Sequence, residues 1–238
     1  MLNNKTNILI KTEKEISYLR EAGNIIAEIM NKMERTIEPG ITTLQLDNIS
    51  KKEIKKNKVK SAFLGLYDFP NTICVSINEE IVHGIPSSRK LKNGDIISID
   101  AGVIVEGFYS DHAKTFAVGD CTQKEINLLS DTSESLKLAI NECQAGKFIG
   151  DIGNAVEKFI IPKGYGLVRN YTGHGIGRSL HEPPQVPNFG DPGSGPKLVP
   201  GMTLAIEPMV NLGDGGTKLC DDGWTVVTSD GAKSAHFE

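Results

Sequence analysis

The sequence is short of several features that would place it in a function class at once. Its four cysteines (Cys74, Cys121, Cys143 and Cys220) are scattered without a CxxC pair, which argues against a structural zinc module or a disulfide framework. No apolar run approaches the ~20 residues needed to span a bilayer. The polar residues 1–7 lack the apolar core of a signal peptide. The net charge of -4 does not call for nucleic acid or an acidic membrane. These absences favour a reduced, cytoplasmic protein.

What is present predicts a globular protein that begins with helices. The 238 residues, 39% of them hydrophobic, suit one large domain or two small ones with an ample core. Three threonines are each followed three residues later by Glu or Gln, the capping box that begins a helix, and apolar residues then recur at helical spacing. Strand-like segments follow at 72–78 and 96–116. The three predicted helix starts are Thr12 with Glu15, Thr42 with Gln45, and Thr122 with Glu125.

The chain contains an internal repeat. Residues 91–100 and 198–207 both read Leu-x-x-Gly-x-x-x-x-Ile-acid, and each segment follows matching caps and helices in the same order. Such repeats mark the architecture of a fold. We therefore expect a duplicated helix-helix-strand unit, with repeats at about 12–121 and 122–238, and a site built by both halves on their pseudo-twofold axis.

A hairpin organises the first repeat. Glu106 and Gly107 interrupt a β-rich run, and a turn there places Asp111 opposite Gly102 and diagonal to Asp100. Side chains alternate faces along a strand, so the two aspartates share a face with their Cβ atoms roughly 5–8 Å apart. Two carboxylates in a buried site repel each other. A divalent metal ion between them is the natural counter-charge.

Five side chains are candidate metal ligands, and none is convincing alone. A lone aspartate at a strand end is usually a turn or cap residue, and a histidine between glycines is often a loop residue. Together, four carboxylates and one imidazole suit Mn, Fe(II) or Co(II) better than zinc. Four negative charges favour two ions, which can activate water and polarise a carbonyl, so the chemistry indicated is metal-assisted hydrolysis. The five are Asp100, Asp111, His174, Glu207 and Glu238.

Together with Ile99-Asp100 and Ser110-Asp111, four further motifs make the sequence resemble type I methionine aminopeptidases of the M24 metallopeptidase family. The resemblance covers nearly the whole chain, and it implies the α+β pita-bread fold over a single catalytic domain, residues 1–238. Family members continue beyond the last glutamate ligand, so we expect the natural chain to extend past Glu238. The four motifs are Asn78-Glu79-x-x-Val82-His83-Gly84-Ile85-Pro86, Gly173-His174-Gly175-Ile176-Gly177, His181-Glu182-x-Pro184 and Ile206-Glu207-Pro208.

The resemblance assigns roles to the five ligands. It implies that Asp111 and Glu238 bridge two metal ions, that Asp100 holds one ion, and that His174 and Glu207 hold the other. It also implies that Glu207 exchanges protons with the attacking water, a suitable role for a metal-bound carboxylate near neutral pH.

The resemblance also implies how the substrate is bound. His83 matches a histidine that contacts the substrate near the scissile amide, and His181 matches one that hydrogen-bonds the substrate carbonyl and stabilises the developing oxyanion. Leu66 and Leu180 are aliphatic where better-known members carry aromatic residues, which bears on inhibitor profile more than on methionine preference. Asn78 and Ser234 match positions near a monovalent-cation site. The implied methionine pocket consists of Phe63, Leu66, Phe69, Cys74, Leu180 and Trp224.

The function implied is removal of the initiator methionine from nascent chains with a small second residue, by a monomeric cytoplasmic enzyme that meets such chains at the ribosome. Two alternatives stay open. An X-Pro peptidase of the same fold would need further substrate-site histidines and usually an additional N-terminal domain. A catalytically inactive binding protein for ribosomes or RNA is favoured only by the lysine-rich run at 51–60, a segment more typical of a solvated helix face.

Overall fold

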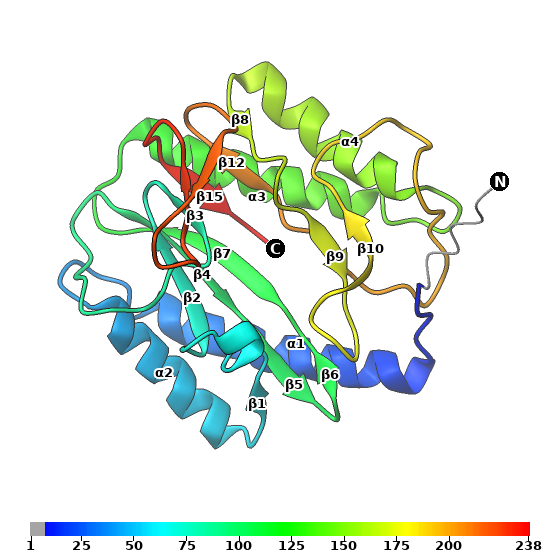
Figure 1. Ribbon diagram of the computed structural model, residues 1–238, viewed down its shortest axis with the longest axis horizontal. Helices are drawn as coiled ribbons and strands as arrows, with labels where there is room; N and C mark the ends of the chain where they lie inside the picture. The colour runs from blue at the N-terminus through cyan, green and yellow to red at the C-terminus, as the bar shows by residue number, and fades with distance from the viewer. Residues whose placement is uncertain (1–7) are drawn as a thin grey trace.

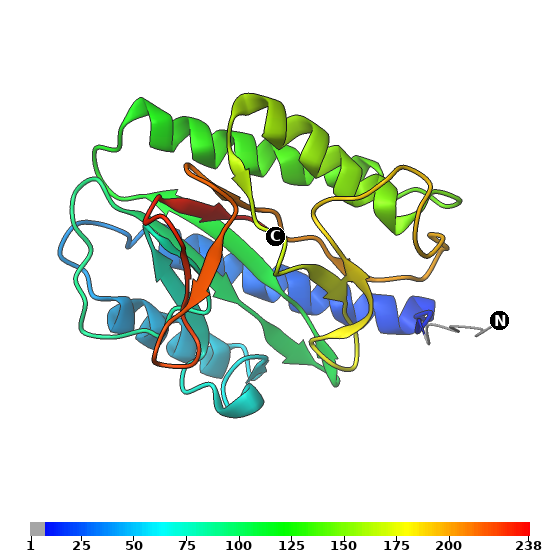
Figure 2. The same ribbon diagram turned by 45° about the horizontal axis from the view of Figure 1, so that its top comes forward.

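The computed structural model describes residues 8–238, in which two pairs of helices lie on either side of short antiparallel strands (Figures 1 and 2). The α+β class predicted from the sequence is confirmed. Residues 1–7, whose polarity argued against a signal peptide, lie outside the described residues. Among residues 8–238 no helix combines the length and the apolarity needed to cross a membrane.

The helices begin where the sequence predicts. At each of the three predicted capping boxes the threonine hydroxyl accepts the N–H of the Glu or Gln three residues on, and that side chain accepts the threonine N–H. The fourth helix has no such threonine, and there the Phe148 N–H donates to the Asp151 carboxylate at 2.7 Å. The helices are α1 (Glu13–Glu34), α2 (Thr43–Lys56), α3 (Gln123–Asn141) and α4 (Ile149–Ile160).

The first half contains the predicted hairpin in the predicted register. Val105 pairs with Phe108, and Asp100 pairs with Ala113, which places Asp111 opposite Gly102. Glu106 and Gly107 have φ values of 50° and 80°, as a type I′ turn requires. The strands are β1 (Lys60–Ser61), β2 (Ile73–Ile77), β3 (Glu80–Val82), β4 (Ile96–Ala101), β5 (Val103–Val105), β6 (Phe108–Tyr109) and β7 (His112–Ala117), with a 3-10 turn at Leu66–Asp68.

The second half forms shorter strands. In one sheet β9 lies between β10 and β11, and in another β12 lies between β15 and β8. Strand β14 crosses to the first half, where Val226 pairs with Val82 of β3. The strands are β8 (Gly166–Leu167), β9 (Gly173–Gly175), β10 (Glu182–Val186), β11 (Leu204–Ala205), β12 (Met209–Asn211), β13 (Thr217–Leu219), β14 (Val226–Thr228) and β15 (Ser234–His236).

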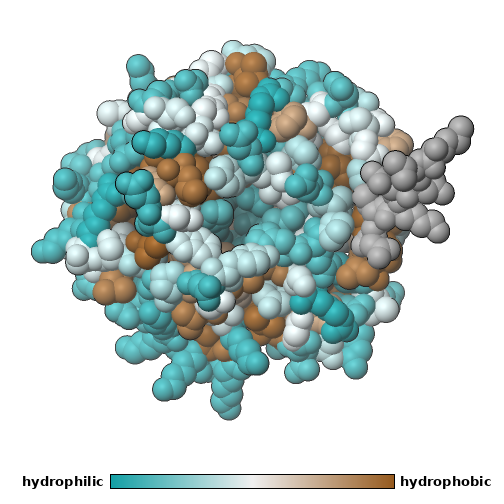
Figure 3. Space-filling view, viewed as in Figure 1, coloured by the Kyte–Doolittle hydropathy of each residue, from teal (hydrophilic) through white to brown (hydrophobic). Residues whose placement is uncertain are grey.

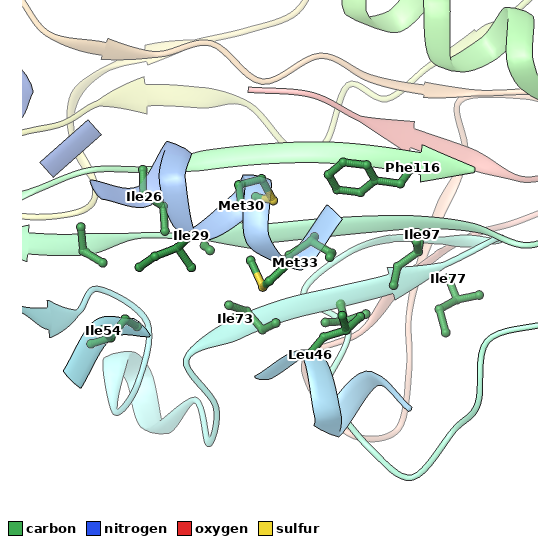
Figure 4. Packing of buried hydrophobic residues seen from close by; sticks show 14 of the residues in the cluster. Ile26, Ile29, Met30, Met33, Leu46, Ile54, Ile73, Ile77, Ile97 and Phe116 are labelled. Atoms are coloured by element: carbon green, nitrogen blue, oxygen red, sulfur yellow. The ribbon is translucent and has the colours of Figure 1, made fainter. Parts of the chain in front are cut away.

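Each helix pair covers its own hydrophobic core. In the first half, Met30 and Met33 of α1 and Leu46 of α2 pack with Ile73 and Ile97 of the sheet (Figure 4). Burying each such side chain stabilises the fold by about 1.5–3 kcal/mol. A separate core under α3 and α4 is built from Leu128, Ile152, Val156, Leu167 and Val210, among others.

One apolar residue of the helical pattern faces outward. Ile140, near the end of α3, is 52% exposed. It borders an open groove between α1 and α3 instead of the core. Helical spacing identifies one apolar stripe, but how far that stripe is covered depends on the neighbouring helix.

Candidate functional site

The two aspartates of the first half lie close to strand ends. Asp100 lies near the end of β4, and Asp111 lies between β6 and β7. The Oδ1 atom of each is buried without a hydrogen-bond partner among the described residues. Burial is the main cause that raises the pKa of Asp100 to about 7. The pKa of Asp111 is raised by burial, and then by the charges of Glu238 and Asp100.

The second half brings three side chains to the same point. His174 is the middle residue of β9, Glu207 follows β11, and Glu238 lies just beyond β15 near the centre of Figure 1. The His174 Nε2 atom lies 3.8 Å from Asp111 Oδ2 and 3.5 Å from Glu207 Oε1. One ligand atom each from Asp111, His174 and Glu238 lie within 4.8 Å of one another. Burial raises the pKa of both glutamates, and the neighbouring carboxylates raise it further.

The imidazole of His174 is prepared for a ligand. Its Nδ1 lies 2.9 Å from the Gly175 carbonyl oxygen, so an N–H there donates to that oxygen and leaves Nε2 free to bind a cation. Burial lowers the pKa of His174 to about 4, and this keeps the ring neutral near pH 7. A neutral imidazole is the form that binds metals.

The donor set fits divalent cations. Buried carboxylates are unfavourable unless they are paired or bound to a metal, and here Asp100, Asp111 and Glu238 each keep an oxygen without a partner among residues 8–238. The salt bridges of the described chain place no lysine or arginine against these carboxylates. Cations are therefore the missing charge.

Glycines on both sides of His174 allow β9 to fit between its neighbours. A Cβ atom on Gly173 would lie 2.3 Å from the Ala205 carbonyl oxygen, and one on Gly175 would lie 2.3 Å from the Pro183 carbonyl oxygen. Any side chain at either position would displace the strand. The two glycines thus let β9 pack closely against its neighbours, and this packing fixes the position of the His174 imidazole.

A cavity of about 230 Å³ opens beside the carboxylates. Figure 3 shows a hollow with hydrophilic colours at the centre of this face. One side of the cavity is apolar, and there Phe69 and Trp224 meet edge to face with ring centroids 5.0 Å apart. The structure brings all thirteen predicted site residues to this cavity, while their individual roles stay predictions. The apolar wall is formed by Phe63, Leu66, Phe69, Cys74, Leu180 and Trp224, and the polar wall by His83, Asp100, Asp111, His174, His181, Glu207 and Glu238.

Besides His174, two histidines line both this cavity and a wider cleft of about 710 Å³. The ring of His181 stands edge to face against His174, with centroids 4.5 Å apart. His83 follows β3 with φ 62°, and burial lowers its pKa to about 4. A neutral imidazole at each position offers one N–H donor to a bound molecule.

Hydrogen bonds and a buried ion pair of Glu182 fix the segment that carries His181. The Glu182 carboxylate accepts the N–H groups of Arg178 and Ser179. The same carboxylate pairs with Lys11, and both side chains are 5% exposed. Because the pair is buried, replacing one partner would leave an uncompensated charge. Lys11, which precedes α1, therefore helps to hold the segment that carries His181.

Two residues at the site were not predicted. Tyr67 borders the cavity from the 3-10 turn. His236 is buried, its Nε2 lies 3.8 Å from Glu207 Oε2, and neither ring nitrogen has a hydrogen-bond partner among the described residues. Its spacing could have identified it, since residues two apart on a strand share a face and Glu238 follows two positions later.

Comparison with known proteins identifies the family of this chain and its structural relatives. A model of metallopeptidase family M24 matches residues 17–236. The chain is 48% identical to a methionine aminopeptidase from Clostridium perfringens over 97% of this chain and 93% of that protein. It is 42% identical to a methionine aminopeptidase of known structure from Thermotoga maritima, with a TM-score of 0.95 over 97% of this chain and 93% of that one. An Xaa-Pro dipeptidase from Bacillus anthracis shares the fold, with 24% identity and a TM-score of 0.73 over 95% of this chain and 61% of that one.

Proposed function

This chain belongs to metallopeptidase family M24 and has its pita-bread fold, and on that premise we propose that it is a metal-dependent methionine aminopeptidase that removes the initiator methionine from new chains with a small second residue. The observation that carries the proposal is the two-sided cavity. Its polar wall can hold the reacting amide, and its apolar wall can hold the methionine side chain. An inactive binding protein would not need both.

The five candidate ligands would hold two divalent ions, with Asp111 and Glu238 shared between them, Asp100 on one ion, and His174 and Glu207 on the other. Mn, Fe(II) and Co(II) suit this oxygen-rich set. When bound, such ions activate water and polarise a carbonyl.

The remaining chemistry belongs to the side chains. Glu207, whose carboxylate pKa is raised by burial, takes up a proton from the attacking water and passes it to the leaving amine. His181 donates an N–H to the substrate carbonyl, and His83 contacts the scissile amide. The apolar wall excludes water from the methionine side chain and selects it by shape, at about 1–3 kcal/mol per methylene.

The wider setting follows from this reaction. We propose a cytoplasmic monomer that acts on nascent N-termini near the ribosome, with residues 12–121 and 122–238 as repeats of one catalytic domain. A monovalent cation near Asn78 and Ser234 completes the set. The Ser234 N–H donates to the Asn78 carbonyl oxygen at 2.8 Å, which supports a shared site for these two residues.

The test is methionine release from Met-Ala-Ser by metal-free protein titrated with Mn(II), Co(II) and Fe(II). An X-Pro peptide is assayed in parallel. Metal-dependent release from Met-Ala-Ser alone is expected. Release from the X-Pro peptide instead would identify a proline-specific peptidase, and metal binding without either activity would favour a binding protein.

A further inference from the structure

We propose that Tyr67 is a specificity-determining residue that, together with His181, forms the rim against which the residue following the methionine lies. The proposal rests on the proposed function and adds to it a side chain that limits the size of the second residue. The argument uses three observations: the place of Tyr67 in the cavity, its contact with His181, and the backbone that holds it.

Tyr67 combines exposure with a place at the cavity. The residue is 71% exposed, yet it lines the same cavity as the metal-ligand cluster. Its neighbours on the turn behave differently, since Phe63 and Phe69 are buried in the apolar wall. An exposed large aromatic residue that is also part of a cavity wall lies at the mouth of that cavity.

The ring of Tyr67 packs on His181. The two ring planes are 14° from parallel and their centroids are 6.3 Å apart. His181 in turn meets His174, a candidate metal ligand, edge to face. The three rings form a row from the ligands to the solvent, in which Tyr67 is outermost. A group that leaves the metal side past His181 therefore meets Tyr67.

The backbone of Tyr67 lies in a conformation that its side chain disfavours. Its φ and ψ are 48° and 33°, and Asp68 follows with φ 69°. Such left-handed residues persist only where the surrounding structure fixes them, and they cluster at functional sites. Two hydrogen bonds fix this turn, from the Gly65 N–H to the Phe69 carbonyl oxygen and from the Phe69 N–H to the Leu66 carbonyl oxygen, each 2.9 Å.

The contact is restricted to one substrate position. The wider cleft shares His83, His174, His181 and Glu207 with the cavity, but its lining does not include Tyr67. Because Tyr67 lies at the mouth of the cavity and outside the cleft, we place the second residue at the mouth and the third and later residues in the cleft, away from Tyr67. Removal of the ring should relax selection at the second residue and leave selection at the third residue unchanged.

The experiment compares kcat/KM for Met-Ala-Ser and Met-Leu-Ser in the metal-loaded wild type, Tyr67→Gly, Tyr67→Asn and Tyr67→Phe. Glycine and asparagine tolerate the left-handed backbone, so these two variants remove the ring without unfolding the turn. Both should lower the preference for alanine over leucine by about tenfold, a size typical of a lost steric wall. Tyr67→Phe should keep the wild-type preference, because the ring alone forms the rim.

Leu64→Ala is the matched control, because Leu64 lies on the same turn, is 53% exposed and does not line the cavity. It should leave the preference unchanged, and a Met-Ala-Xaa series should not distinguish any of the variants. In NMR spectra the His181 ring protons should shift in Tyr67→Gly and stay in place in Leu64→Ala. An unchanged alanine-to-leucine ratio, or an equal fall for both peptides, would overturn the role of Tyr67 while the aminopeptidase function stands. A wild type that does not cleave Met-Ala-Ser would overturn both.

Discussion

The two halves of the molecule bring carboxylates to one point by different means. In the first half Asp100 lies within the six-residue strand β4, where it pairs with Cys74 on one side and Ala113 on the other. In the second half Glu207 follows the two-residue strand β11 and precedes Pro208, so it lies in a break between β11 and β12. The repeated sequence pattern thus ends within a paired strand in the first half and in the gap between two strands in the second half.

In the second half, individual hydrogen bonds hold the two glutamates in place of a continuous strand ladder. The Asn188 side-chain amide donates to the Glu207 carbonyl oxygen at 2.9 Å. The Glu238 N–H donates to the Ala113 carbonyl oxygen, and His112 Nδ1 lies 2.9 Å from the Glu238 carbonyl oxygen. Glu238 is therefore held by β7 of the first half. The first half thus supplies backbone and side-chain contacts that hold a ligand of the second half.

The most severe test of the comparison is Asp111→Asn, because Asp111 lies in the first half and faces candidate ligands from both halves. Partners that only orient a ligand cost 10–100-fold in metal affinity, so loss of the ligand itself should cost at least about 100-fold. Metal content and methionine release should fall together. Asp120→Asn is the control, since Asp120 is exposed and does not line the cavity. An active, metal-replete Asp111→Asn enzyme would remove Asp111 from the ligand set.

A second test separates substrate contacts from metal binding. His181→Ala should keep its metal and lose mainly kcat, by about 100-fold, the usual cost of one oxyanion donor. Steady-state kinetics and metal analysis measure the two effects separately. Unchanged turnover would exclude His181 from the oxyanion role. Loss of metal would show that His181 also supports metal binding by the second half.

The dependence of Glu238 on the first half predicts a smaller effect for His112→Ala. Removing the donor to the Glu238 carbonyl oxygen should lower metal affinity by about tenfold, measured by competition with a chelator. His112→Asn retains an N–H donor and should keep most of the affinity. Equal affinities in all three proteins would mean that Glu238 does not need this contact.

The smallest effect is a change of stability with pH. The raised carboxyl pKa values, about 7 for Asp100, mean that the metal-free fold holds protons that the unfolded chain releases above about pH 4. These groups therefore lower the stability of the metal-free fold as pH rises through about 7. The lowered pKa values of His83 and His174, about 4 each, act in the opposite direction and lower stability as pH falls from about 6.5 to 4.

Above pH 6.5 only the carboxylates act. The Tm of chelated protein should then fall by a few degrees up to pH 8, whereas saturating Mn(II) should flatten the curve because metal binding releases the same protons. A metal-free Tm that rises over this range would contradict the assignment of the buried carboxyl groups.

Local chemistry explains which parts of the fold could be predicted. Thr12 and Glu15 satisfy each other's backbone groups within one turn, so the start of α1 could be located from two residues. The turn at Glu106 and Gly107 sets the register of the hairpin, and the register sets the facing of Asp111. Each of these features is determined by neighbours in the sequence.

The parts that could not be predicted depend on distant neighbours. The left-handed turn at Tyr67 has no signal in its own residue, because its backbone is fixed by the closure between Gly65 and Phe69. The burial of His236 beside Glu207 depends on the pairing of β12 with β15. The apolar wall of the cavity, with Phe63 and Trp224 far apart in the sequence, was located by resemblance to a family rather than by any periodicity.

The division of the ligands between the halves has a consequence for the lifetime of the protein. A metal ion held by Asp111 of the first half and His174 of the second would act as a cross-link, because the halves could not separate until the ion has left. Such a link slows unfolding in addition to lowering the free energy of the fold. Proteases that cut transiently opened chains should therefore degrade the metal-free form first. The amount of this protein in a cell would then follow the supply of its metal.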